Sequence, residues 1–103
     1  MLIGLLLILA LPVAAQRKVK FGIFDKATEQ PIIGAVITYA DNEKLKSPQR
    51  VVTNMDGEAT ISVPQGGKCY YQVVSVGYNP LKGTIGSVSS LKLFMTEDVM
   101  KVN

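Results

Sequence analysis

Hydrophobic and polar residues alternate along most of this chain after residue 18, and this period of two is typical of half-buried β-strands. In KVKFGIFD, the first such stretch, Val19, Phe21 and Ile23 share one face. Later stretches place further apolar residues on one face, namely Ala59, Ile61, Val63, Leu91, Leu93 and Met95. The pattern predicts strands at 18–25, 32–40, 51–53, 58–63, 68–76, 81–87 and 91–96.

Polar segments rich in Gly and Pro separate these strands. The turn KATEQP ends at Pro31, and the longest loop spans 40–50. Gly34 lies within a predicted strand and indicates a bulge. No segment after residue 15 has a helical period, so we predict an all-β fold, a seven-stranded antiparallel β-sandwich.

The first 15 residues, MLIGLLLILALPVAA, carry no charged side chain and are too few to span a membrane as a helix. An apolar run broken by Pro12 and followed by small residues is typical of a secretory signal peptide. We expect a signal-peptide helix at 1–15, a short lead at 16–18, a β-sandwich domain at 19–96 and a tail or linker at 97–103. A retained membrane anchor or a buried core element is the alternative for 1–15.

The composition excludes several kinds of chemistry. There is no His and only one Cys, Cys69, so His-dependent nucleophilic catalysis, His-ligated zinc and an intrachain disulfide are excluded. Cys69 is expected to be a buried apolar residue. The net charge of +3 comes from scattered basic residues without a nucleic-acid-binding motif. We therefore predict no enzymatic activity, no catalytic or metal site, no cofactor, no nucleic-acid partner and no transmembrane segment after residue 15.

The segment NMDGE has alternating oxygen-bearing side chains, as a calcium loop does. Taking Asn54 as position 1 puts Ala59 at position 6, where Gly is required, and Gln65 at position 12, where Glu is required. Asp56-Gly57 is instead a strong signal for a type I′ hairpin turn that sets the register of the flanking strands.

Three segments, FGIFDKATEQPIIGAVIT, VVTNMDGEATISVP and VVSVGY, together resemble the carboxypeptidase-regulatory-like domain, over Val19 to about Thr96. The resemblance implies a transthyretin-like Greek-key β-sandwich, as found in exported proteins of Bacteroidetes. The positions that match the family pattern are expected to determine the fold, namely Asp25, Pro31, Gly34, Ala35, Thr53, Asp56, Gly57, Gly77 and Tyr78. Asn54, Phe24 and the long 40–50 loop depart from that pattern.

The resemblance implies an accessory or interaction domain of the cell envelope, in the periplasm, at the outer membrane or secreted. Such domains often precede TonB-dependent outer-membrane transporters, so the N-terminal part of a transporter is a narrower expectation. A protein partner is expected to bind an edge strand or the 40–50 loop. Two alternatives are a metal-dependent hydrolase using Asp25 or Asp41 and a carbohydrate-binding module using the tyrosines, Tyr39, Tyr70, Tyr71 and Tyr78.

Overall fold

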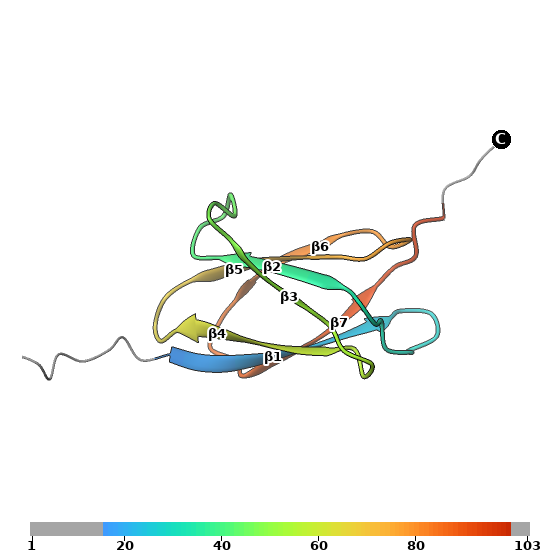
Figure 1. Ribbon diagram of the computed structural model, residues 1–103, viewed down its shortest axis with the longest axis horizontal. Helices are drawn as coiled ribbons and strands as arrows, with labels where there is room; N and C mark the ends of the chain where they lie inside the picture. The colour runs from blue at the N-terminus through green and yellow to red at the C-terminus, as the bar shows by residue number, and fades with distance from the viewer. Residues whose placement is uncertain (1–15, 100–103) are drawn as a thin grey trace, which may run out of the picture.

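The computed structural model describes residues 16–99, which form seven β-strands and no helix (Figure 1). The strands are β1 (Gln16–Asp25), β2 (Val36–Ala40), β3 (Gln49–Val52), β4 (Glu58–Pro64), β5 (Cys69–Val74), β6 (Leu81–Ile85) and β7 (Ser90–Met95). The predicted all-β architecture of seven strands is confirmed. The expected signal-peptide helix at 1–15 lies outside the described residues.

Two sheets pack face to face. The three-stranded sheet has the order β4-β1-β7, and the four-stranded sheet has the order β3-β2-β5-β6. Only β2–β3 and β5–β6 are pairs of successive strands within one sheet. The other four connections, at 26–35, 53–57, 65–68 and 86–89, cross from one sheet to the other.

The expectation of a wholly antiparallel sandwich is wrong at one pair. β1 and β7 run parallel, in register from Lys20 opposite Ser90 to Asp25 opposite Met95, whereas all other strand pairs are antiparallel. β7 reaches β1 by a crossing from β6 in the other sheet, so no hairpin fixes its direction relative to β1.

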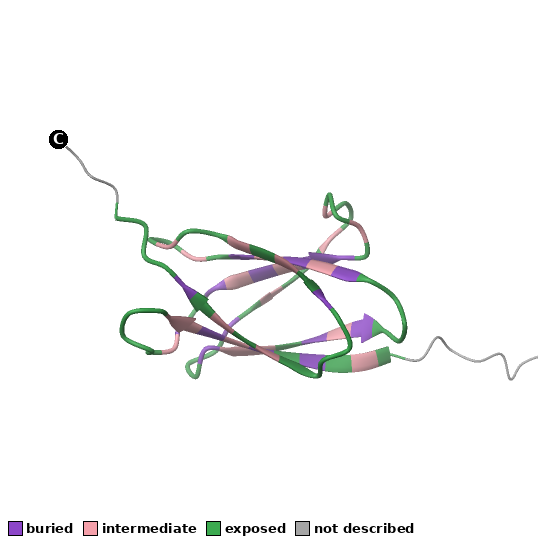
Figure 2. Ribbon diagram, turned by 180° about the vertical axis from the view of Figure 1, so that it is seen from behind, coloured by how far each residue is buried: buried purple, intermediate pink, exposed green. Residues whose placement is uncertain are grey.

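The core lies between the sheets and is made by the inward residues of every second position (Figure 2). Val19, Phe21 and Ile23 of β1 are fully buried, as their alternation predicts. The ring of Phe21 meets the ring of Tyr71 edge to face, at 5.2 Å between centroids. Cys69 is a buried free thiol, as expected, and burial raises its pKa.

Several predicted boundaries differ from the observed ones. Residues 16–18, expected as a lead, begin β1, and the expected strand at 32–40 starts only at Val36. Gly34 therefore lies in a turn, with φ of 81°, and not at a strand bulge. At the other end, Glu97 forms a β-bridge with Tyr78, so the expected tail begins as part of the folded domain.

The turn at 54–57 is not the predicted type I′ hairpin. β3 pairs with β2 and β4 pairs with β1, so this turn joins two sheets and sets no register between its flanking strands. Only Gly57 has positive φ, at 74°. Asn54 closes the turn, because its carbonyl accepts from Gly57 N at 2.9 Å and its side-chain Oδ1 accepts from Asp56 N at 2.9 Å and Glu58 N at 3.0 Å.

Candidate functional site

Asp25 and Tyr78 join β1 to the connection between β5 and β6. The Tyr78 hydroxyl donates to Asp25 Oδ2 at 2.7 Å, and Asp25 Oδ1 accepts from the backbone N–H groups of Ala27 at 2.8 Å and Thr28 at 3.0 Å. The Tyr78 hydrogen bond is the main cause that lowers the pKa of Asp25, and the same bond raises the pKa of Tyr78. Both oxygens of this carboxylate are therefore engaged in holding backbone and side chain in place.

Thr53 is a buried polar residue that fixes the turn before β2. Its hydroxyl donates to the Ile32 carbonyl at 2.7 Å and accepts from Ala35 N at 2.8 Å, and Thr53 N donates to the Ala35 carbonyl at 2.9 Å. Gly34 N donates to the Thr53 carbonyl at 3.1 Å. These bonds attach the 32–35 turn to the chain that follows β3.

Gly57 lies directly against β1 and Pro31. A Cβ at this position would be 2.6 Å from the Ile23 carbonyl oxygen and 2.9 Å from Pro31 Cβ. Gly77 has φ of 88°, and its carbonyl accepts from Asp98 N at 2.8 Å. Of the residues matched to the family pattern, eight thus hold backbone segments together, whereas the Asp56 side chain is exposed.

The four tyrosines do not form the common surface that a carbohydrate platform would require. Tyr39 and Tyr71 are buried, with the Tyr39 hydroxyl donating to Gln49 Oε1 at 2.9 Å, and Tyr78 is bonded to Asp25. Only Tyr70 stands on the outer face of a sheet without such a partner among residues 16–99. The hypothesis that these four tyrosines together form a carbohydrate-binding surface is therefore wrong.

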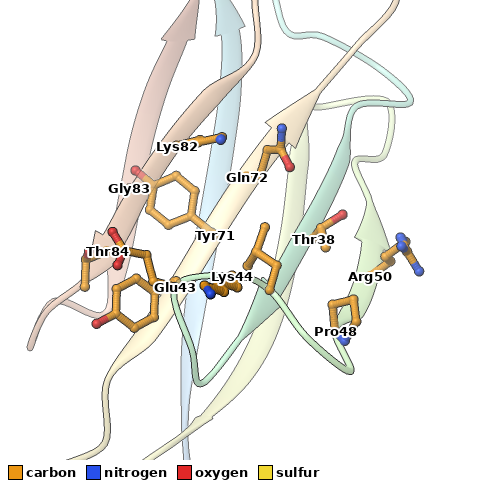
Figure 3. Close-up of a pocket in the computed structure, with 12 residues that line it drawn as sticks. Thr38, Glu43, Lys44, Pro48, Arg50, Tyr71, Gln72, Lys82, Gly83 and Thr84 are labelled. Atoms are coloured by element: carbon orange, nitrogen blue, oxygen red, sulfur yellow. The ribbon is translucent and has the colours of Figure 1, made fainter.

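A groove of about 660 Å³ lies on the outer face of the four-stranded sheet (Figure 3). Its floor carries the outward residues of all four strands, and the 41–48 loop folds over one side of it. Asn42 holds this loop in shape, since its Oδ1 accepts from Lys46 N at 2.8 Å and its Nδ2 donates to the Lys46 carbonyl at 3.1 Å.

Two rows of side chains cross this outer face in register. One row places Thr38 between Arg50 of β3 and Gln72 of β5, with Lys82 of β6 at the far edge. The neighbouring row is apolar and consists of Val52, Val36 and Val74. Val52 is 58% exposed and Val74 is 43% exposed. The face therefore combines cationic ends with an uncovered apolar stripe.

The charge on the rim of the groove is mainly positive. Arg50, Lys82 and Lys44 line it, and Glu43 is the acidic residue among its lining residues. Sequence reasoning named the loop at 40–50 but missed the sheet face beneath it. The alternation predicts that Thr38, Gln72 and Lys82 point away from the core, but it does not predict that they lie side by side.

A smaller aromatic cluster occupies the outer face of the three-stranded sheet. Phe24 and Phe94 are opposite each other in register, with ring centroids 6.0 Å apart. The ammonium group of Lys92 lies 5.0 Å from the Phe24 centroid and 5.7 Å from the Phe94 centroid. Gly22 leaves room for the Phe24 ring. This cluster was not predicted, because the alternation rule assigns outward positions to polar residues.

The acidic residues do not gather into a metal site within 16–99. No three His, Cys, Asp or Glu side chains lie together there. Asp41 Oδ1 accepts a hydrogen bond from the Nδ2 of the neighbouring Asn42 at 3.0 Å. Asn54, the first position of the calcium-loop pattern, uses its Oδ1 for two backbone N–H groups. Residues 16–99 contain no helix that could span a membrane.

Comparison with known proteins yields structural likeness alone. Neither a protein-family model nor a curated protein matches the chain. Hydroxyquinol 1,2-dioxygenase from Pseudomonas putida is similar with a TM-score of 0.62 and 12% identity, covering 86% of this chain and 59% of that one. A streptococcal ancillary pilin gives a TM-score of 0.62 and 18% identity, over 82% of this chain and 30% of the pilin.

A third similar structure is the pilus 2b backbone protein of group B streptococcus, with a TM-score of 0.59 and 15% identity. It is matched over 81% of this chain and 42% of its own length. The chain thus spans 59% of the dioxygenase and less than half of either pilin. At these identities the likeness shows a shared β-sandwich fold.

The prediction that this chain has no enzymatic activity is wrong, because neither the fold nor the composition supports that conclusion. An enzyme, the hydroxyquinol dioxygenase, has the same fold as this chain, so a β-sandwich of this shape is compatible with catalysis. The absence of His excludes only the classes of chemistry that require it. The pilins show that the fold also occurs in proteins that form pili.

Proposed function

We propose that this chain is an exported protein-interaction module, and that the outer face of its four-stranded sheet binds an extended acidic and apolar segment of a partner protein. The observation that carries the proposal is the pairing of two rows on that face. A valine stripe, in which Val52 and Val74 are exposed and Val36 is half-buried, lies beside a row with Arg50 at one edge and Lys82 at the other.

The chemistry of the face selects the partner. Exposed valines remove water on contact with another apolar side chain, at about 25 cal/mol per Å² of apolar surface buried. Arg50, Lys82 and Lys44 attract carboxylates, and Arg50 can bind one through two parallel hydrogen bonds. A segment that alternates Glu or Asp with apolar residues matches both rows.

The strand edges offer a way to align such a segment. β3 and β6 are the edge strands of the four-stranded sheet, so each has backbone groups facing away from its neighbour. A partner strand added at β3 would lie beside both Arg50 and the 41–48 loop. The likeness to two pilus proteins supports a role in protein assembly.

Family and location are part of the same proposal. The carboxypeptidase-regulatory-like pattern is supported by the way its residues lie, since Asp25 bonds to Tyr78 and Gly57 lies against Pro31. The apolar 1–15 segment supports export to the cell envelope. The narrower form of this proposal is that the domain precedes a TonB-dependent transporter. Sequencing the gene beyond the Asn103 codon tests it.

The experiment is NMR mapping on the isotope-labelled chain with two synthetic peptides of equal length. One peptide alternates Glu with Val and the other alternates Lys with Val. We expect the Glu peptide alone to shift the amide signals of Val36, Val52 and Lys82, and we expect the shifts to weaken as salt is added.

Charge reversal on each sheet provides the matched comparison. Arg50→Glu should abolish binding of the Glu peptide, whereas Lys92→Glu on the opposite sheet should leave it unchanged. Shifts that map to the three-stranded sheet, or binding that survives Arg50→Glu, would contradict the proposed surface.

A further inference from the structure

The two ends of the described chain lie at opposite ends of the sandwich, and the terminal strands run side by side between them (Figure 1). β1 begins the fold, β7 ends it, and they are parallel neighbours. From this arrangement we infer that the domain is built to resist tension applied between its N-terminal and C-terminal ends. The inference is independent of the proposed partner surface.

The direction of loading follows from the topology. Tension on the two ends pulls β1 back along its own axis and pulls β7 forward along the same axis. The strands are paired from Lys20 and Ser90 to Asp25 and Met95, so sliding must break all of these hydrogen bonds together. A pair opened from one end breaks one bond at a time, and each break needs little force.

Backbone contacts extend the β1–β7 ladder beyond its paired residues. Lys20 N donates to the Ser89 carbonyl at 3.0 Å, and Lys26 N donates to the Met95 carbonyl at 3.0 Å. The Arg17 guanidinium donates to the carbonyls of Val88 and Gly86, which attaches the start of β1 to the connection that leads into β7. Sliding would stretch all of these bonds.

The end of β7 is also held by the second sheet. Asn79 N donates to the Thr96 carbonyl at 2.9 Å, and Asp98 N donates to the Gly77 carbonyl at 2.8 Å. Inside the sandwich, Phe21 and Met95 are fully buried on the two sliding strands. Separation would therefore expose core side chains, which adds to the resistance.

The test is single-molecule force spectroscopy on the full 103-residue chain in two pulling geometries. In the first geometry, handles are fused to the two termini. In the second, one handle stays at the N-terminus and the other is inserted at Gly66. Gln16 pairs with Pro64, so the second geometry opens the antiparallel β1–β4 pair from one end.

We expect a several-fold higher unfolding force for the terminal geometry at the same pulling speed. Arg17→Met keeps most of the apolar stem and removes the guanidinium, so it should lower that force, whereas Arg50→Met should not. Equal forces in the two geometries, or a lower force between the termini, would overturn the inference. Both geometries leave the β1–β7 pair unaltered, so their comparison needs no substitution in either strand.

Discussion

Replacing Gly57 with Ala is the most direct test of how the sheet-crossing turn is packed. The residue has φ of 74°, and an added Cβ would be 2.6 Å from the Ile23 carbonyl oxygen, which belongs to the backbone of β1. The Gly57 carbonyl also accepts from Ile23 N at 2.8 Å. The clash can be relieved only if the turn moves away from β1. That movement would break the hydrogen bond between Gly57 and Ile23.

Two costs add in this variant. The left-handed conformation costs an L-residue about 1 kcal/mol. Forcing a methyl group against fixed backbone costs roughly 1–3 kcal/mol more. We expect the free energy of unfolding to fall by about 2–4 kcal/mol, a large share of the roughly 5–15 kcal/mol of a typical domain. With an m-value of about 1.5 kcal/mol/M, the urea midpoint falls by roughly 1.3–2.7 M.

Gly66 supplies the matched control. It also has φ of 74°, but an added Cβ there meets nothing within 4 Å. Gly66→Ala should therefore show the conformational cost of about 1 kcal/mol alone. Urea unfolding followed by circular dichroism measures both variants. If Gly57→Ala loses no more stability than Gly66→Ala, the close packing of the turn on β1 is refuted.

Three further predictions concern other parts of the domain. Thr53→Val should lower the free energy of unfolding by about 2–4 kcal/mol in a urea titration, because two buried backbone partners lose their hydrogen bonds, whereas Thr60→Val on an exposed position should change little. Tyr78→Phe should raise the folded-state pKa of Asp25 toward its ordinary value in a carbon-detected NMR titration. The lowered pKa of Asp25 stabilises the fold above about pH 4, and this stabilisation is lost as the pH falls through the folded-state pKa. The difference in unfolding free energy between wild type and this variant should therefore be larger at pH 7 than at pH 3. A constant difference would contradict the role of the bond. Cys69 should react slowly with a thiol reagent at pH 8 in the native chain and much faster in denaturant, because burial shields the thiol and raises its pKa. Equal reaction rates in the two conditions would show that the thiol is accessible in the native chain.

Alternation was a reliable guide to single strands. Val19, Phe21 and Ile23 are fully buried because a strand with one face on a core must place every second side chain inward. The strand at 32–40 was predicted too long for a local reason. Its first residues are β-branched or apolar, but Gly34 has positive φ and Thr53 holds the turn through side-chain hydrogen bonds. A contact made by a residue so far along the chain is not visible in a local pattern.

Pairing between strands was beyond the reach of the pattern. The parallel β1–β7 pair and the sheet crossing at 54–57 depend on which sheet each strand joins, and strand period carries no information on that choice. The groove escaped prediction for the same reason. Arg50, Thr38, Gln72 and Lys82 become one row only after β3, β2, β5 and β6 are placed side by side.

The position of β7 also sets the order in which the domain can be completed. β1 is made first, yet its parallel partner begins with Ser90, after the other five strands. Until then one long edge of β1 has no neighbour, and the core that contains Phe21 and Ile23 lacks Met95. Contacts this distant in sequence make folding slow. During synthesis from the N-terminal end, the domain would therefore stay open and prone to association until its last strand arrives.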